Sequence, residues 1–195
     1  MAYVIDSCFH WIGYHMVQHL LNKGFEVIGV DALEDEKKEA LYMFVGRNSC
    51  FQHFHTLGEI ERYSDRGQID GIIGVTEGNL HDYPYGQIKI ADSIHELQES
   101  KDIENIRVPL SYGEWMPRDE TYGFPGDHQI VMEDLVESES ACYIEDFIKE
   151  ILEKVTGNTH RTGGKSNDIA ARDLAGHLND HFQRHKHIYM AGNSM

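Results

Sequence analysis

The chain has few cysteines, few basic residues and no long apolar runs. Its three cysteines, Cys8, Cys50 and Cys142, are odd in number and far apart, so neither a disulfide framework nor a zinc motif can be recognised. Lysine and arginine together number 17 against 33 aspartates and glutamates, which gives a net charge of −16. This acidic balance argues against binding to nucleic acid or to an anionic membrane surface.

No apolar run reaches the length of a membrane span, and the first residues do not form a signal-peptide pattern. Together with the scarcity of cysteine, these features predict a cytoplasmic protein. Hydrophobic residues make up 41% of the 195 residues and charged residues 26%, a composition that supports a folded core. We expect a single domain over 1–195, whose last part, about 127–195, is a small helical portion.

The N-terminal stretch alternates between two kinds of apolar pattern. A short apolar run at 3–5 precedes helical spacing of apolar residues over 12–21, and a second apolar run over 26–30 ends at Asp31. Strand, helix and strand in this order predict a βαβ crossover with parallel strands. An acidic residue at the end of the second strand is where such a unit hydrogen-bonds an adenosine ribose. Asp31 favours NAD over NADP, because a carboxylate repels a 2′-phosphate.

The glycine fingerprint of a dinucleotide-binding turn is mostly missing. Its three positions fall on Ser7, His10 and Gly13, so only the last is a glycine. A non-glycine residue in a left-handed turn costs about 1–2 kcal/mol, and we expect the histidine ring to take up space for phosphate. The first-turn amide groups of the helix would still attract an anion. The predicted cofactor-binding residues are Ser7, Phe9, His10, Trp11, Ile12, Gly13, Asp31 and Lys89. The alternative is a Rossmann-like crossover that binds no dinucleotide.

Apolar periodicity also predicts the elements that follow the crossover. In the first half we expect a helix over 35–46, a strand over 51–57, a short helix or loop over 59–65, and a strand over 69–76. We then expect a helix from Tyr85 through Leu97 and a strand over 105–110. In the last part we expect a short strand over 130–135, helices over 142–155 and 168–182, and a frayed end from His185.

Tyr85 and Lys89 form a Y-x-x-x-K pair. On a helix, residues four apart share one face, so the ammonium of Lys89 would lie near the phenol of Tyr85 and favour the phenolate. Tyr85 would then act as acid and base, Lys89 would lower the tyrosine pKa and hold a ribose, and Thr76 would polarise a carbonyl. The alternative interpretation is a surface tyrosine and lysine on an ordinary helix.

In their order along the chain, these segments resemble the extended short-chain dehydrogenase/reductase family, the NAD-dependent epimerases and dehydratases of sugar nucleotides. The resemblance is carried by segments 12–17 with 27–31, 84–89, 107–109 with 111–115, 143–146, and Gly163-Gly164 with 169–178. It implies a Rossmann-like parallel sheet with helices on both faces. That sheet would be compacted relative to the family, because one strand–helix unit between the third strand and Tyr85 is missing from the predicted elements. It further implies NAD as cofactor, a nucleotide or nucleotide-sugar as ligand, and a homodimer.

Two functions follow from the sequence. The first is an NAD(P)-dependent sugar-nucleotide epimerase/dehydratase-like protein, with catalysis lost or altered. The alternative is a non-catalytic nucleotide- or protein-binding regulatory module on the same fold. A third hypothesis, a metal site on His177, His181 and His185, lacks ligands from a second segment, so we interpret these histidines as a solvated polar helix face and predict no metal.

Overall fold

The computed structural model describes residues 1–61, 69–75, 87–91, 103–126, 128–156 and 171–191. The chain forms two compact units, Met1–Val108 (unit 1) and Pro109–Met195 (unit 2). Of the helices described in either unit, none is both long and apolar enough to cross a membrane.

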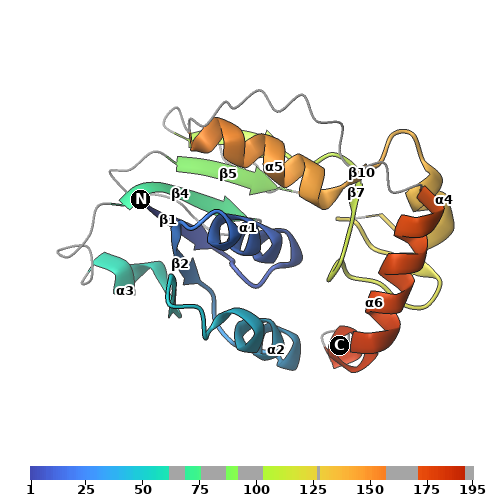
Figure 1. Ribbon diagram of the computed structural model, residues 1–195, viewed down its shortest axis with the longest axis horizontal. Helices are drawn as coiled ribbons and strands as arrows, with labels where there is room; N and C mark the ends of the chain where they lie inside the picture. Colours follow the sequence, from blue (N-terminus) through green and yellow to red (C-terminus); the bar gives the residue numbers. More distant parts are fainter. Residues whose placement is uncertain (62–68, 76–86, 92–102, 127, 157–170, 192–195) are drawn as a thin grey trace. The chain divides into compact units, whose positions relative to one another are not determined.

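Unit 1 is built on a six-stranded sheet whose neighbouring strands are all parallel (Figure 1). Its strands are β1 (Ala2–Asp6), β2 (Glu26–Val30), β3 (Phe51–Phe54), β4 (Ile69–Val75), β5 (Gln87–Ala91) and β6 (Ile103–Arg107). They are ordered β3-β2-β1-β4-β5-β6 across the sheet. This is the strand order of a doubly wound Rossmann-like sheet, and it confirms the predicted fold class.

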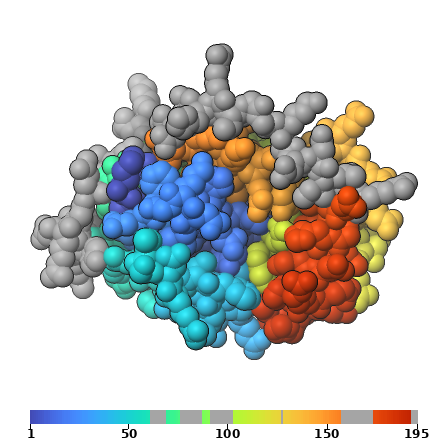
Figure 2. Space-filling model, in the orientation of Figure 1, coloured from blue at the N-terminus to red at the C-terminus, as the bar shows by residue number. Residues whose placement is uncertain are grey.

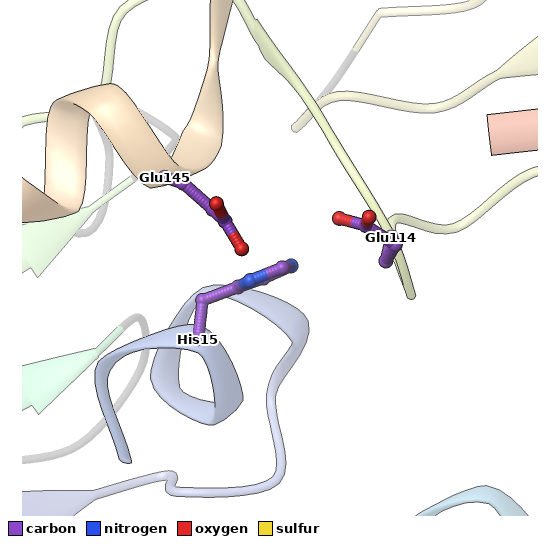
Figure 3. A group of neighbouring side chains, drawn as sticks. All are labelled: His15, Glu114 and Glu145. Atoms are coloured by element: carbon purple, nitrogen blue, oxygen red, sulfur yellow. The ribbon is translucent and has the colours of Figure 1, made fainter. Parts of the chain in front are cut away.

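The described helices of unit 1 are α1 (Trp11–Asn22), α2 (Glu36–Val45) and α3 (Leu57–Glu61). One apolar cluster joins Val4 and Ile72 of the sheet to Ile60 of α3. Because side chains alternate between the faces of a strand, the buried Tyr3 and Ile5 point to the opposite face. α1 belongs to that other layer, and His15, drawn in Figure 3, is a buried polar residue of this helix.

β5 corrects the predicted helix from Tyr85. Residues 87–91 pair in parallel with β4 on one side and β6 on the other, so this segment is an interior strand of the sheet. The spacing of Ile90 with later apolar residues fits a helix, but within 87–91 the apolar and polar residues alternate, as in a strand. The predicted loss of a strand is therefore wrong, because β5 occupies that place in the sheet; the connections on either side of β5, 76–86 and 92–102, lie outside the described residues.

The described residues of unit 2 form two small sheets and three helices. β7 (Ser111–Tyr112) pairs in parallel with β10 (Cys142–Tyr143), and β8 (Tyr122–Gly123) pairs antiparallel with β9 (Ile130–Val131). The helices are α4 (Met132–Glu137), α5 (Ile144–Val155) and α6 (Ala171–Ala191). In the space-filling view α6 is the red body, beside yellow-green side chains of the segment that begins unit 2 (Figure 2).

Three boundaries in unit 2 differ from the prediction. Only Ile130 and Val131 of the predicted strand are extended, since α4 begins at Met132. The helix predicted from 142 starts two residues later, because Cys142 and Tyr143 pair with β7. α6 continues beyond His185 to Ala191 with a kink at His185. The predicted fraying is wrong there because Ile188 and Tyr189 are buried.

Candidate functional site

The turn between β1 and α1 has the backbone shape of a dinucleotide-binding turn although its first glycine is replaced. Ser7 has φ of 58°, the left-handed conformation that the fingerprint position requires. Its N–H donates to the Asp6 carboxylate over 3.1 Å. A Cβ on Gly13 would lie 2.3 Å from the Ser7 carbonyl oxygen. Only a residue without a side chain therefore allows α1 to approach the turn this closely. Ser7 and Gly13 thus lie in the positions that the sequence predicted for them.

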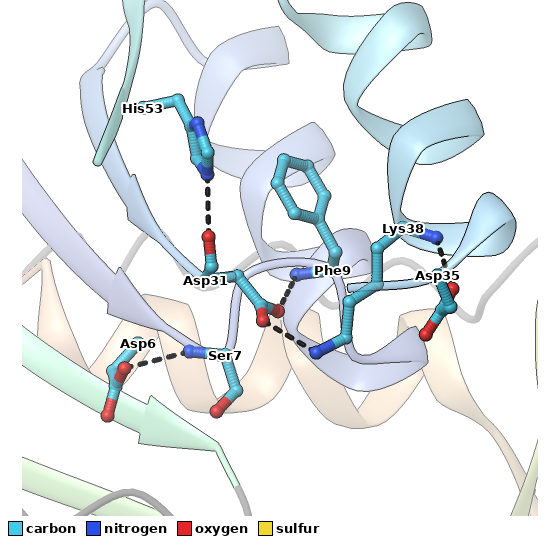
Figure 4. A network of polar contacts seen from close by, with 7 residues as sticks. All are labelled: Asp6, Ser7, Phe9, Asp31, Asp35, Lys38 and His53. Atoms are coloured by element: carbon cyan, nitrogen blue, oxygen red, sulfur yellow. Dashed lines mark hydrogen bonds and ion pairs between the residues drawn. The ribbon is translucent and has the colours of Figure 1, made fainter. Parts of the chain in front are cut away.

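Asp31 follows β2 and holds the turn in place (Figure 4). One carboxylate oxygen accepts the backbone N–H of Phe9 over 3.0 Å, and the other lies 2.8 Å from the Lys38 ammonium. The Asp31 carbonyl accepts a hydrogen bond from Nε2 of His53 over 2.8 Å, which assigns the proton of that imidazole to Nε2. Asp31 is therefore a structural anchor as well as a candidate ribose ligand.

The Lys38 ion pair offsets the Asp31 charge from which a preference for NAD over NADP was predicted. Burial lowers the pKa of Lys38, but its hydrogen bond to Asp31 and the charges of Asp31, Asp35 and Glu34 outweigh burial and raise the pKa. Lys38 is held near Asp31 because Asp35 caps α2 by accepting the Lys38 backbone N–H over 2.8 Å. The carboxylate expected to repel a 2′-phosphate is thus neutralised by a lysine from the first turn of α2.

His10 lies at the N-cap of α1, where the second fingerprint glycine would stand. It makes no side-chain cap hydrogen bond, and α1 has no acidic residue in its first turn. Its Nδ1 is buried and has no hydrogen-bond partner among the described residues. Burial, followed by the charges of Lys37 and Lys38, lowers the pKa of His10 to about 3, so the imidazole is neutral. A neutral ring with an unsatisfied nitrogen therefore lies at a helix N-terminus.

The other predicted residues of the turn contribute side chains to the core. Phe9 lies among Tyr42, Phe51 and His53, with ring centroids 5.3 to 6.3 Å from its own. Trp11 and Ile12 are 3% and 0% exposed. These side chains could not hold a cofactor without leaving the core, so a ligand could reach Trp11 and Ile12 only through their backbone amides.

Lys89 lies on β5, not on a helix, and its side chain is only 1% exposed. In the sheet register Lys89 pairs with Gly74 of β4, and Gly74 pairs with Asp6 of β1. The three positions therefore share one face, and the missing side chain of Gly74 leaves room between the charged residues. Burial raises the pKa of Asp6, while the Ser7 N–H and the Lys89 charge lower it. Tyr85 and Thr76, the other predicted catalytic residues, lie outside the described residues.

The sequence analysis did not predict the Asp6–Lys89 arrangement. The available signal was Gly74, a position without a side chain in a mostly apolar strand. Recognising it requires the strand order, because Asp6, Gly74 and Lys89 are far apart in the sequence.

The histidines of α6 contact residues of unit 2. His177 Nε2 lies 2.7 Å from a carboxylate oxygen of Glu114, whose other oxygen accepts the Tyr143 hydroxyl proton over 2.7 Å. Figure 3 shows Glu114 beyond β7 and Glu145 in the first turn of α5. His181 Nδ1 lies 3.1 Å from the hydroxyl oxygen of Tyr189.

Trp115 packs against two of the α6 histidines. His181 and His185 lie against its ring, with centroids 4.6 and 5.1 Å away. Trp115 has φ of 62°, and its N–H donates to the Tyr189 hydroxyl over 2.6 Å. The solvated-face interpretation is therefore wrong for His181 and His185, which belong to an aromatic cluster.

Two of the segments that carried the family resemblance, 111–115 and 143–146, lie together in unit 2, whereas Gly163-Gly164 lies outside the described residues. Ser111 pairs with Cys142 and Tyr112 with Tyr143 in the small β7–β10 sheet. A Cβ on Gly113 would lie 2.3 Å from Ile144, so this glycine allows α5 to begin directly beside β7. These contacts give both segments a structural role in unit 2.

No protein-family model matches the chain, and no curated protein matches it. Three solved structures illustrate what it is similar to. Gre2 from Candida albicans is 15% identical over 47% of this chain and 35% of that one, with a TM-score of 0.34. Yeast methylglyoxal/isovaleraldehyde reductase Gre2, complexed with NADPH, is 12% identical over 78% and 70%, with a TM-score of 0.49. UDP-glucose 4-epimerase from Thermotoga maritima, with UDP-glucose, is 12% identical over 94% and 99%, with a TM-score of 0.42.

This chain thus spans about a third of the Candida albicans protein and most of the other two. At TM-scores below 0.5 we draw nothing about function from these likenesses. The Rossmann-like assignment stands on the parallel strand order of unit 1.

Proposed function

We propose that the chain binds a nicotinamide dinucleotide, with a ligand phosphate against the first turn of α1. The observation that carries this proposal is the unpartnered, buried Nδ1 of His10 at the N-cap of that helix. Buried polar atoms in folded proteins are nearly always hydrogen-bonded, and an exception calls for a ligand or another cause. A phosphate oxygen beside the N-cap would accept the Nδ1 proton.

The charges around the turn support an anionic ligand. Lys37 and Lys38 are close enough to His10 to lower its pKa, and the N-terminal end of α1 adds the positive end of the helix dipole. These cationic groups lie beside the turn in a chain of net charge −16, and one of them, Lys38, is paired with Asp31. The Ser7 conformation and the close approach at Gly13 give the backbone the shape that phosphate groups meet in dinucleotide-binding turns.

The proposal gives the Tyr85–Lys89 pair no acid–base role. That role depends on helical spacing, whereas Lys89 is a buried strand residue beside Asp6. Residues 92–102, which connect β5 to β6, contain no tyrosine. We therefore favour a dinucleotide-binding protein without Tyr–Lys chemistry over an active sugar-nucleotide epimerase or dehydratase.

The test is a fluorescence titration with NADH of the wild type and of two His10 variants. His10→Asn offers an amide nitrogen in place of Nδ1, whereas His10→Phe keeps a ring without a donor. We expect saturable binding by wild type and His10→Asn, and affinity about tenfold or more weaker for His10→Phe, as for a lost hydrogen bond to a charged group. Absence of saturable NADH binding by the wild type would refute the proposal.

A further inference from the structure

Unit 2 contains a cavity of about 450 Å³ between α4, α6 and the segment from Arg118 to Thr121. Its volume is in the range of small-molecule sites. Met132, Val136 and Leu178 give it apolar walls, while Thr121 and Asn179 contribute a hydroxyl and an amide. The cavity is formed by residues of unit 2 alone, and neither the sequence motifs nor the dinucleotide proposal uses them.

Arg118 is the charged residue buried in this cavity wall, at 4% exposure. Its guanidinium lies over the Phe182 ring, 4.4 Å from the centroid. Nε donates to the Asp119 carbonyl over 3.1 Å and Nη1 to the Leu178 carbonyl over 3.4 Å. A guanidinium has five N–H donors, so three are left for another acceptor.

Arg118 takes part in no ion pair with the described residues. Burying a cation without a paired anion is costly, and carbonyl contacts and an aromatic ring offset only part of that cost. Of the two carboxylates at the cavity, Glu120 is paired with Lys186, and Glu133 is exposed to solvent. The charge of Asp119 also acts on Arg118, but no carboxylate of the described residues lies within ion-pair distance of the guanidinium.

Gly176 lines the cavity without a side chain. It lies within α6, where glycine costs about 1 kcal/mol relative to alanine. A Cβ at this position would meet nothing within 4 Å. Backbone packing therefore does not require the glycine, and its effect is to leave the cavity wall without a side chain.

We propose that this cavity binds a small organic molecule with an apolar body and one anionic group, a carboxylate or a phosphate, held by Arg118. A guanidinium presents a planar pair of N–H donors that matches both groups. The apolar residues opposite would contact the body of the ligand. This site is independent of the proposed dinucleotide site, so either can fail without the other.

The probes are benzoate, phenyl phosphate and benzamide, each titrated into the full chain by ligand-observed NMR. Benzoate and phenyl phosphate present the two anionic groups on one body, and benzamide is a neutral molecule of the same shape. We expect millimolar or tighter binding of at least one anion, and binding of benzamide about tenfold weaker. The better of the two anions identifies the group that the site prefers.

Three variants locate the binding. Arg118→Gln removes the cation, Gly176→Leu fills the cavity while keeping Arg118, and Arg184→Gln removes an exposed arginine of the same helix as a charge-matched control. We expect anion affinity to fall about tenfold or more in the first two and to stay unchanged in the third. Should Arg118→Gln fail to fold, Gly176→Leu still decides. Absence of saturable binding of both anions to the wild type, or undiminished binding by Gly176→Leu, would overturn the proposal.

Discussion

Gly13 and Ser7 show how single residues shape the turn of unit 1. An added methyl at Gly13 would lie 2.3 Å from the Ser7 carbonyl, a distance that no neighbour can accept without moving backbone. We predict that Gly13→Ala destabilises the protein by about 2 kcal/mol, as in overpacked cores. Gly58→Ala, in α3, is the matched control, because its Cβ meets nothing within 4 Å. Urea denaturation measures both; equal stability of the two variants would contradict the close approach.

His10 makes stability depend on pH. Its folded pKa of about 3 lies below its ordinary value of 6.5, so the unfolded chain binds the extra proton between these limits. The contribution of the neutral His10 to the free energy of unfolding is thus fully present above pH 6.5 and decreases as the pH falls toward 3. Between pH 7 and pH 5 this loss amounts to about 2 kcal/mol.

The measurement is denaturant unfolding of wild type and His10→Asn at pH 7 and pH 5. The variant lacks the titrating group, so its stability should fall by about 2 kcal/mol less than that of the wild type. Equal losses in the two proteins would show that His10 is solvated.

We expect Lys38 to affect the preference of the proposed site between NADH and NADPH. Paired with Asp31 over 2.8 Å, it cancels the charge that would repel a 2′-phosphate. We predict that wild type binds NADH and NADPH with affinities within about tenfold of each other. Lys38→Gln should weaken NADPH binding about tenfold or more beyond any effect on NADH binding. Fluorescence titration with both nucleotides checks this; an unchanged NADPH to NADH ratio would contradict it.

At the scale of the elements, β5 places Lys89 on the same face of the sheet as Asp6 of β1, with β4 between the two strands. Lys89 reaches the face of Asp6 across Gly74, and its charge lowers the Asp6 pKa. We predict a coupling of about 0.5–3 kcal/mol in the double-mutant cycle of Asp6→Asn and Lys89→Met, since the effects of electrostatically coupled neighbours are not additive. Additive losses would mean that the two groups do not interact.

Elements with local signals were predictable, and those that depend on pairing were not. The first crossover, α2 with its Asp35 cap, and β4 follow from periodicity and capping residues. β5 was missed because Ile90 and the apolar residues after it fit helical spacing, whereas pairing with β4 and β6 makes 87–91 a strand.

The same distinction applies to the candidate site. The positions of Ser7, Gly13 and Asp31 followed from the order of strand, helix and strand, because backbone shape depends on local sequence. The partners of Asp31 and His10 were not predictable, because Lys38 and Lys37 reach the turn only after α2 has folded beside it. Likewise, the cavity of Arg118 requires α4 and α6 to be assembled.

On the scale of the whole molecule, the two units carry separate candidate sites. The proposed dinucleotide site belongs to Met1–Val108, and the Arg118 cavity belongs to Pro109–Met195. Each site consists of residues from its own unit and can be altered without touching the other. The variants at Gly176 and Arg118 are therefore suitable controls for NADH binding, and the His10 variants are suitable controls for anion binding.

The most direct test of the dinucleotide proposal is the ¹⁵N NMR signal of His10 Nδ1, recorded without ligand and with saturating NADH. A phosphate oxygen that accepts the Nδ1 proton would shift this resonance in step with NADH binding, and His53, which already donates to the Asp31 carbonyl, is the internal reference. We predict a saturating shift at His10 with little change at His53. An Nδ1 signal that does not move as NADH is added would contradict the account.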